Sequence, residues 1–308
     1  MGGLKQLQAA VWFWPDAETS KPGPALHDVR MSNDWVVSRT GWKPEDTVLA
    51  LRSGGPANHE HADRNSVILK AHGERLFHDP FKAGYSPTLP TWLLRQTEAH
   101  SAVLIDGKGH QYHDGREGTN PSFAEARVTA YSNGADWMCV TSDATDAYAL
   151  VLPEVRQVER TVVVLKPDVV ILLDRVALDK AHPVQLRFQA FNDDGRAQVA
   201  ATGAAFSIQR PRAVAHGVAY SASAVQAGTG RLALPEAEGI FPYAQVSSAS
   251  ALRHEILTVV STGPARTAAA NLAVTREADG WSVAGEYRGQ RYAARLRVTD
   301  GKAPQFIA

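Results

Sequence analysis

The chain has 308 residues, with 32 basic and 32 acidic side chains and a formal net charge of zero. This balance provides no basic field for a nucleic acid or an anionic membrane, so any polyanionic ligand must be bound by local groups. Cys139 is the only cysteine, which excludes an internal disulfide and a cysteine-rich zinc module. No run of about 18 apolar residues occurs, and segment 1–15 is a poor signal peptide, so the sequence predicts no membrane span.

The first segment, 1–46, is rich in proline, aspartate and tryptophan, which predicts an irregular or edge segment that packs aromatic rings onto a sheet. The strongest signal that follows is a hairpin, in which 161–165 and 169–173 flank Lys166-Pro167-Asp168. Both arms are almost continuously apolar, which predicts strands buried on both faces in the middle of a sandwich.

Other short runs rich in β-branched residues and leucine, bounded by glycine, proline and aspartate, predict further strands. These runs are 47–52, 66–71, 75–78, 101–105, 123–131, 184–190, 205–209, 213–219, 255–261, 271–276, 281–287 and 291–298. Segment 219–230 is predicted to be a surface loop or a soft boundary, and helices are expected only at 4–12 and 89–98.

Without βαβ alternation, this pattern predicts an all-β fold: a large antiparallel two-layer β-sandwich with stacked, jelly-roll-like sheets and few short helices. We divide the chain into the irregular segment 1–46, a metal-bearing sandwich core at 47–180, and 181–308. The last part is expected to continue the sandwich or to form a second β-sheet subdomain.

One stretch, 54–106, holds the residues that are arranged for chemistry. His59 and His61 are two positions apart, so on an extended segment both imidazoles project to one side, about 6.6 Å apart along the strand. After a chain reversal, Asp79 returns beside the loop that holds His61, and His100 opens the next strand. Two histidines and one carboxylate suit Zn²⁺ and equally the facial triad of non-haem Fe²⁺.

The order of these motifs resembles a known family. The string comprises Gly54-Gly55-Pro56, His59-Glu60-His61-Ala62-Asp63, Asn65-Ser66 before an apolar strand, Gly73-Glu74, Asp79-Pro80, and His100 before Val103-Leu104-Ile105-Asp106-Gly107. It is similar to the C-terminal domain of heparinase II/III-type polysaccharide lyases. The resemblance is specific over 54–106, looser to about position 176 through Glu159-Arg160-Thr161 and Asp174-Arg175-Val176, and weak beyond.

In that family the domain is a stacked β-sandwich that follows an α/α-toroid, and the active site lies in the cleft between them. The resemblance implies that His61, Asp79 and His100 hold a structural zinc ion and that His59 is a catalytic residue facing the cleft. The implied reaction is β-elimination at a uronic acid residue. It requires a group that neutralises the substrate carboxylate, a base for the C5 proton and an acid for the leaving oxygen.

A toroid would lie upstream of Met1, so we expect the chain to be weakly active or inactive alone. Within the chain, Asn58 and Arg64 are assigned to substrate binding, and Arg52 is a further residue able to contact the carboxylate. Tyr112 is assigned to acid or base catalysis, with Tyr85 as the other available phenol.

The expected partners are an acidic polysaccharide or oligosaccharide and an upstream toroid domain or partner chain, but no nucleic acid and no membrane. The resemblance implies a periplasmic or extracellular location.

Three alternatives follow from the same residues. A cupin-like, metal-dependent oxygenase or isomerase would also use the His-Glu-His motif with a distant aspartate and histidine, but with iron in place of zinc. A TIM-barrel amidohydrolase shares the paired histidines but requires eight βα units that the sequence lacks. A non-catalytic carbohydrate-binding sandwich would use zinc to fix its loops and aromatic rings to stack on sugars, binding a glycan without forming product.

Overall fold

The computed structural model describes residues 23–55, 61–110 and 124–307, and their strands form three antiparallel sheets. The first sheet contains, in spatial order, β1(Asp28–Arg30), β2(Trp35–Arg39), β3(Val48–Arg52), β4(Val67–Ala71) and β5(Glu74–Phe77). The last sheet contains β16(Ala273–Glu277), β17(Gly280–Tyr287), β18(Gln290–Arg297) and β19(Gln305–Ile307).

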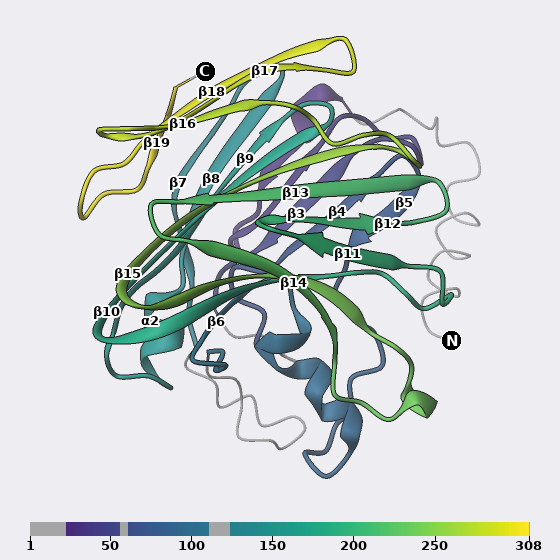
Figure 1. Ribbon diagram of the computed structural model, residues 1–308, viewed down its shortest axis with the longest axis vertical. Helices are drawn as coiled ribbons and strands as arrows, with labels where there is room; N and C mark the ends of the chain where they lie inside the picture. Colours follow the sequence, from purple (N-terminus) through teal and green to yellow (C-terminus); the bar gives the residue numbers. More distant parts are fainter. Residues whose placement is uncertain (1–22, 56–60, 111–123, 308) are drawn as a thin grey trace, which may run out of the picture.

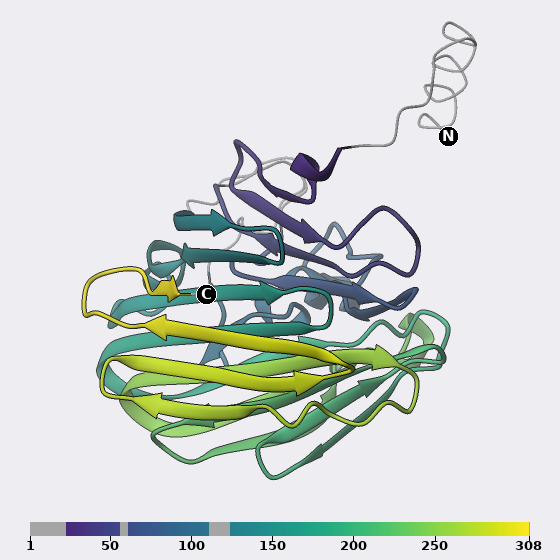
Figure 2. The same ribbon diagram turned by 90° about the horizontal axis from the view of Figure 1, so that it is seen from above.

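The second sheet is the largest and lies between the other two (Figure 2). Its main path runs through β11(Gln198–Thr202), β12(Ala205–Gln209), β13(Ala213–Ser221), β15(Pro242–Pro264), β10(Val169–Gln189), β9(Val155–Leu165), β8(Trp137–Asp143) and β7(Arg127–Asn133). Two further strands pair outside this path, β14(Val225–Arg231) with β15 and β6(Val103–Ile105) with β10. The all-β antiparallel sandwich predicted from the sequence is confirmed, and the C-terminal sheet adds a smaller layer.

Helical segments are short. They are η1(Pro24–Leu26), η2(Pro90–Arg95), η3(Thr97–Ala99), α2(Thr145–Ala149) and η4(Glu236–Glu238). In Figure 1, the blue segment with η2 and η3 lies at the opposite end of the molecule from the yellow C-terminal strands. Over the described ranges, no helix is both long and apolar enough to cross a membrane.

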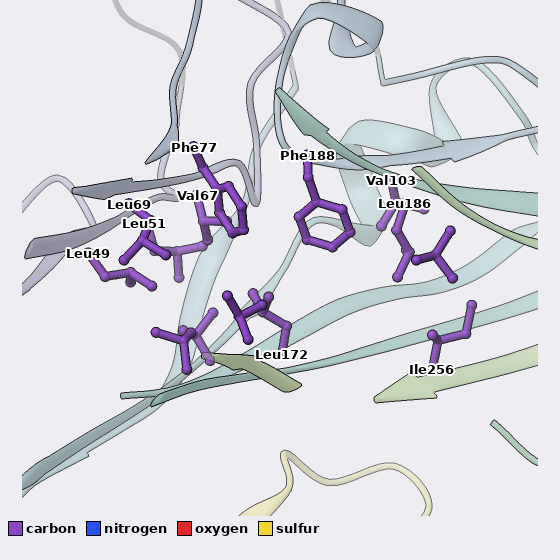
Figure 3. Packing of buried hydrophobic residues seen from close by; sticks show 14 of the residues in the cluster. Leu49, Leu51, Val67, Leu69, Phe77, Val103, Leu172, Leu186, Phe188 and Ile256 are labelled. Carbon is purple, nitrogen blue, oxygen red and sulfur yellow. The ribbon is translucent and has the colours of Figure 1, made fainter. Parts of the chain in front are cut away.

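The main core lies between the first and second sheets (Figure 3). Alternation along β3 turns Leu49 and Leu51 inward, where they join Phe77, Leu172 and Phe188 in one buried cluster. Full burial of a side chain of this size stabilises the fold by about 1.5–3 kcal/mol. The first sheet, which carries part of the candidate site, is therefore held firmly against the large sheet.

The hairpin of β9 and β10 is buried on both faces, as its apolar sequence predicts. Leu165 pairs with Val169 across the turn. Val162 and Leu172 face the main core, while Val163 and Ile171 face a second cluster under the C-terminal sheet. β10 continues through position 180 as one strand, with register shifts near His182 that let the strand bend.

Several local predictions are wrong. Segment 219–230 contains β14 and is not simply a loop. The helix expected at 89–98 is present in part, as two short 3₁₀ helices separated by Gln96, which is extended. Of the part of 1–46 that the structure describes, two stretches are strands, and Trp35 and Trp42 are exposed and do not pack into a core. The helix expected at 4–12 lies outside the described residues.

Candidate active site

Three of the predicted site residues come together where the first sheet meets the large one. His61 lies between β3 and β4, Asp79 follows β5, and His100 follows η3. The Nδ1 atom of His100 is 3.2 Å from Oδ1 of Asp79, and the rings of His61 and His100 are 5.3 Å apart between centroids. The structure thus brings together the two histidines and the carboxylate that the spacing of the sequence singled out.

His100 is the centre of this cluster. Its side chain is 1% exposed, and neither ring nitrogen makes a well-aligned hydrogen bond to a described residue. Buried polar atoms normally have a partner, and leaving one without costs about 1–3 kcal/mol. Asp79 is better satisfied, since Ser66 Oγ donates a 3.1 Å hydrogen bond to Oδ1. The imidazole of His100 is therefore the group with unused bonding capacity.

The charges of the cluster are strongly coupled. Burial alone would raise the pKa of Asp79, but the nearby His100 charge and the Ser66 hydrogen bond hold it below its usual range. Burial would lower the pKa of His100, but Asp79 and Asp63 together raise it. Burial raises the pKa of Asp63 to about 6, although His100 and Arg52 act in the opposite direction. A divalent cation would suit this concentration of carboxylate and imidazole groups.

A buried ion pair fixes the two chain segments that carry the cluster. Arg160 binds Asp174 through two hydrogen bonds of 2.7 and 3.2 Å, and both side chains are almost fully buried. Its remaining terminal nitrogen donates to the carbonyl oxygens of Asn65 at 2.8 Å and Ser101 at 2.5 Å. One guanidinium therefore ties the segment after His61 to the segment after His100.

Sequence reasoning did not assign Arg160 a role. The only available signal was its place in the Glu159-Arg160-Thr161 part of the family resemblance.

A groove of about 160 Å³ opens beside the cluster on the outer face of the first sheet, and its lining includes Asp63 and Asp79. Arg52 lines it, and its guanidinium lies 5.3 Å from the ring centroid of Trp35. A neighbouring hollow of about 290 Å³ shares Ile68, His78 and Phe81 with the groove. An aromatic surface lined also by a cation and carboxylates suits a sugar ring that carries a charged group.

Tyr85 lies close to the same segments. The guanidinium of Arg95 is 4.7 Å from the ring centroid of Tyr85 and 5.2 Å from that of Trp92. The carbonyl oxygen of Arg95 accepts a 2.7 Å hydrogen bond from the amide of Ala62, next to His61. Tyr85 is 53% exposed and lies on the loop that carries Asp79.

The other predicted residues are placed less favourably or lie outside the structure. His59, Asn58 and Tyr112 are outside the described residues. Arg64 is fully buried, its Nε donates to the carbonyl oxygen of Ala124 at 3.2 Å, and burial lowers its pKa to about 9. Substrate binding by Arg64 stays a prediction that this burial does not favour.

The predicted zinc site depends on how the side chains of His61, Asp79 and His100 are placed. Within the described ranges, no three His, Cys, Asp or Glu side chains are already placed so as to hold a metal ion together. The donor types nevertheless fit, because His61, Asp79 and His100 adjoin one another and neither ring nitrogen of His100 makes a well-aligned hydrogen bond to a described residue. The zinc assignment therefore stays a prediction.

Comparison with known proteins assigns the chain to a family. The profile of the family described as "Heparinase II/III-like, C-terminal" matches residues 19–294. The chain belongs to this family. A comparison with curated proteins finds no match.

Solved structures show the same heparinase-type fold. Heparan sulfate lyase HepC from Pedobacter heparinus superimposes with a TM-score of 0.75 at 14% identity, over 97% of this chain and 48% of that one. A structure described as the heparinase III BT4657 gene product gives a TM-score of 0.72 at 14% identity, over 96% and 47% respectively. The chain spans about half the length of these proteins, and identity this low shows the fold alone.

Proposed function

We propose that the chain is the sheet domain of a polysaccharide lyase that cleaves uronic-acid-containing glycans by β-elimination. The observation that carries the proposal is the His61, Asp79 and His100 cluster beside an aromatic groove, in a chain of the heparinase II/III-like family. An acidic polysaccharide or oligosaccharide is the substrate class.

His61, Asp79 and His100 are the residues that would hold a structural zinc ion. The bound ion would cross-link three chain segments and give the buried ring of His100 a partner. Its role is to fix the strand ends that border the groove, so Asp79 and His100 act as ligands and take no part in proton transfer.

The chemistry of the reaction assigns the remaining groups. Arg52, in the lining of the groove, would supply the cation that neutralises a uronate carboxylate, which makes the C5 proton more acidic. Tyr85 offers an exposed phenol for proton transfer, as does Tyr112, and the family resemblance assigns His59 to the substrate cleft. Among the phenols, Tyr85 has support from its contact with Arg95 next to the cluster.

A second, helical domain would complete the active site, either on the same polypeptide or on a partner chain. The matched lyases are about twice as long as this chain, which supports such an arrangement. The whole enzyme would act in the periplasm or outside the cell, where acidic glycans occur.

The test combines a product assay with variants. The chain is mixed with acidic glycans, alone and with a helical lyase domain, and the ultraviolet absorbance of the unsaturated uronate product is followed. We expect little product from the chain alone and clear product from the complete assembly. Rapid turnover by the chain alone would refute the need for a second domain, and no product from any assembly would refute the lyase.

Variants then assign the roles. Tyr85→Phe and Arg52→Gln should lower the elimination rate of the complete assembly, because each removes a group that contacts the reacting unit. Tyr220→Phe is a matched control, since that ring packs under the C-terminal sheet, on the other side of the large sheet from the first sheet and its groove. Equal rates in the Tyr85 variant and the control would remove Tyr85 from the mechanism.

A non-catalytic glycan-binding domain is the second candidate, and the exposed rings of Trp35 and Phe81 beside the groove favour it. Tight binding of an acidic glycan without product, in the presence of the helical domain, would support this role over the lyase. The metal content separates the cupin-like alternative, because bound iron with oxygen consumption would support an oxygenase.

A further inference from the structure

A cleft separate from the candidate active site lies where the ends of β11 and β12 meet the loop after β15. Its volume is about 620 Å³, and three arginines line it: Arg196, Arg210 and Arg266. The amide side chains of Gln198 and Gln209 complete its polar lining. Guanidinium and amide groups are donors, so this lining suits a ligand rich in acceptor oxygens.

The local charge is positive although the whole chain is neutral. Arg210 is buried and makes two hydrogen bonds to Asp194, of 2.8 and 2.6 Å, so its charge is compensated. Arg196 also contacts Asp194, and Arg212 and Arg210 lie 3.5 Å from Glu74. Asp194 and Glu74 are the carboxylates that pair with the arginines of the lining, so these three arginines exceed them by one positive charge.

Arg266 supplies the least compensated of these charges. It is exposed, and none of the ion pairs between described residues includes it. Its backbone has a φ of 67°, in the left-handed region that glycine adopts more easily than arginine. Arg266 therefore offers the cleft an exposed guanidinium that no ion pair between described residues neutralises.

One aromatic ring separates this cleft from the groove at the candidate active site. The ring of His78, which lines the groove, is 5.0 Å from that of Phe191. The guanidinium of Arg210, which lines the cleft, is 5.0 Å from the Phe191 centroid. The linings of the groove and of the arginine cleft therefore contact the same side chain, Phe191.

We propose that the arginine cleft is a second binding site, which holds a sulfate or carboxylate group of an extended acidic oligosaccharide outside the reacting position. Arg196 and Arg266 bind the anionic group, and Arg210 is held in place by Asp194 as the wall of the cleft. The cleft would thereby let a chain with no net charge bind a polyanion through local positive charges. The choice of polymer rests on the proposed lyase function, but the anion chemistry of the cleft does not.

The test is calorimetric titration of the full chain with a heparin oligosaccharide, a neutral dextran oligosaccharide of equal length, and inorganic sulfate. We expect the heparin oligosaccharide to bind and the dextran to fail. The double variant R196Q/R266Q should weaken heparin binding about tenfold, because two exposed charged contacts are lost. Weak binding of inorganic sulfate that the same variant removes would place the contact on the sulfate group.

The matched control is R253Q/R291Q, which removes the same charge from exposed positions in β15 and β18. We expect less than a twofold change in its affinity. Equal weakening in both double variants would mean diffuse attraction and would overturn the site, as would unchanged affinity in R196Q/R266Q. None of these readings depends on product formation, so a failed lyase assay remains distinguishable.

Discussion

The Arg160–Asp174 pair and the His61–Asp79–His100 cluster are groups of charged and polar side chains in neighbouring parts of one interface. They differ in how many of their polar atoms make well-aligned hydrogen bonds. Arg160 directs its nitrogens to the Asp174 carboxylate and to two carbonyl oxygens. His100 is as deeply buried, yet both of its ring nitrogens lack a well-aligned hydrogen bond to any described residue. We call the Arg160 network closed, because its guanidinium nitrogens have hydrogen-bond partners, and the His100 cluster open, because its ring nitrogens make no well-aligned hydrogen bond.

This difference separates a structural role from a ligand-binding role. A buried ion pair whose partners are all present gives little net stability over apolar residues, but it fixes geometry and is costly to break. His100 lies 3.2 Å from Asp79 but makes no well-aligned hydrogen bond, so a ligand that binds its ring nitrogens would offset part of the cost of burying it. We therefore expect Arg160 to stabilise the fold without any ligand, and His100 to stabilise it only when a ligand is bound.

The largest effect is expected when the closed network is broken on one side. Arg160→Met leaves the buried carboxylate of Asp174 without its partner and releases the carbonyls of Asn65 and Ser101. We expect a loss of about 3–5 kcal/mol in the free energy of unfolding, measured by urea denaturation. The double variant R160M/D174L removes both charges and should lose clearly less. A double variant as unstable as the single one would contradict the closed-network interpretation.

The open cluster should show its effect through zinc. If His61, Asp79 and His100 hold the ion, zinc at a free concentration 100 times its dissociation constant adds about 2.7 kcal/mol to the stability. His61→Ala should lose the bound zinc and the matching rise in melting temperature together. His59→Ala should keep both and affect only substrate handling. Full zinc content with unchanged melting in His61→Ala would reject this ligand set.

A smaller and pH-dependent effect is expected at Asp194. Its hydrogen bonds with Arg210 and Arg196 hold its pKa well below the usual range. A carboxylate with a lowered pKa in the folded state contributes stability above its unfolded pKa of about 4 and loses it as the pH falls further.

Asp194→Asn should therefore cost about 1 kcal/mol at neutral pH, and less than that in acid. Thermal melting of both proteins across the acidic range checks this. A constant difference between them at all pH values would show that the charge of Asp194 is not the cause.

The parts of the fold that the sequence could predict are those that depend on local pattern. The apolar arms of the β9–β10 hairpin and the turn at Lys166-Pro167-Asp168 are sufficient to place two central strands. The proximity of His61, Asp79 and His100 could also be predicted from the sequence, because a short reversal between His61 and Asp79 brings strand ends together.

Other features depend on contacts between distant residues and carry no local signal. Arg160 lies 95 positions from Asn65 and 59 from Ser101, so its bridging role follows only from the folded chain. Arg52 and Arg64 flank one short segment, and the sequence does not decide which of them lines the groove and which is buried. The three-layer packing decides it by turning Arg64 toward the carbonyl of Ala124.

The smallest effect on the free energy of unfolding is expected at an ion pair on the exposed surface. Arg127 donates a 3.3 Å hydrogen bond to Asp146, and both side chains are 61% exposed. Water competes for both charges in this position, so Arg127→Ala should change the free energy of unfolding by less than about 0.5 kcal/mol in urea denaturation. A loss near that of Arg160→Met would mean that burial does not set the cost of breaking ion pairs here, and the distinction between the closed and open clusters would lose its physical basis.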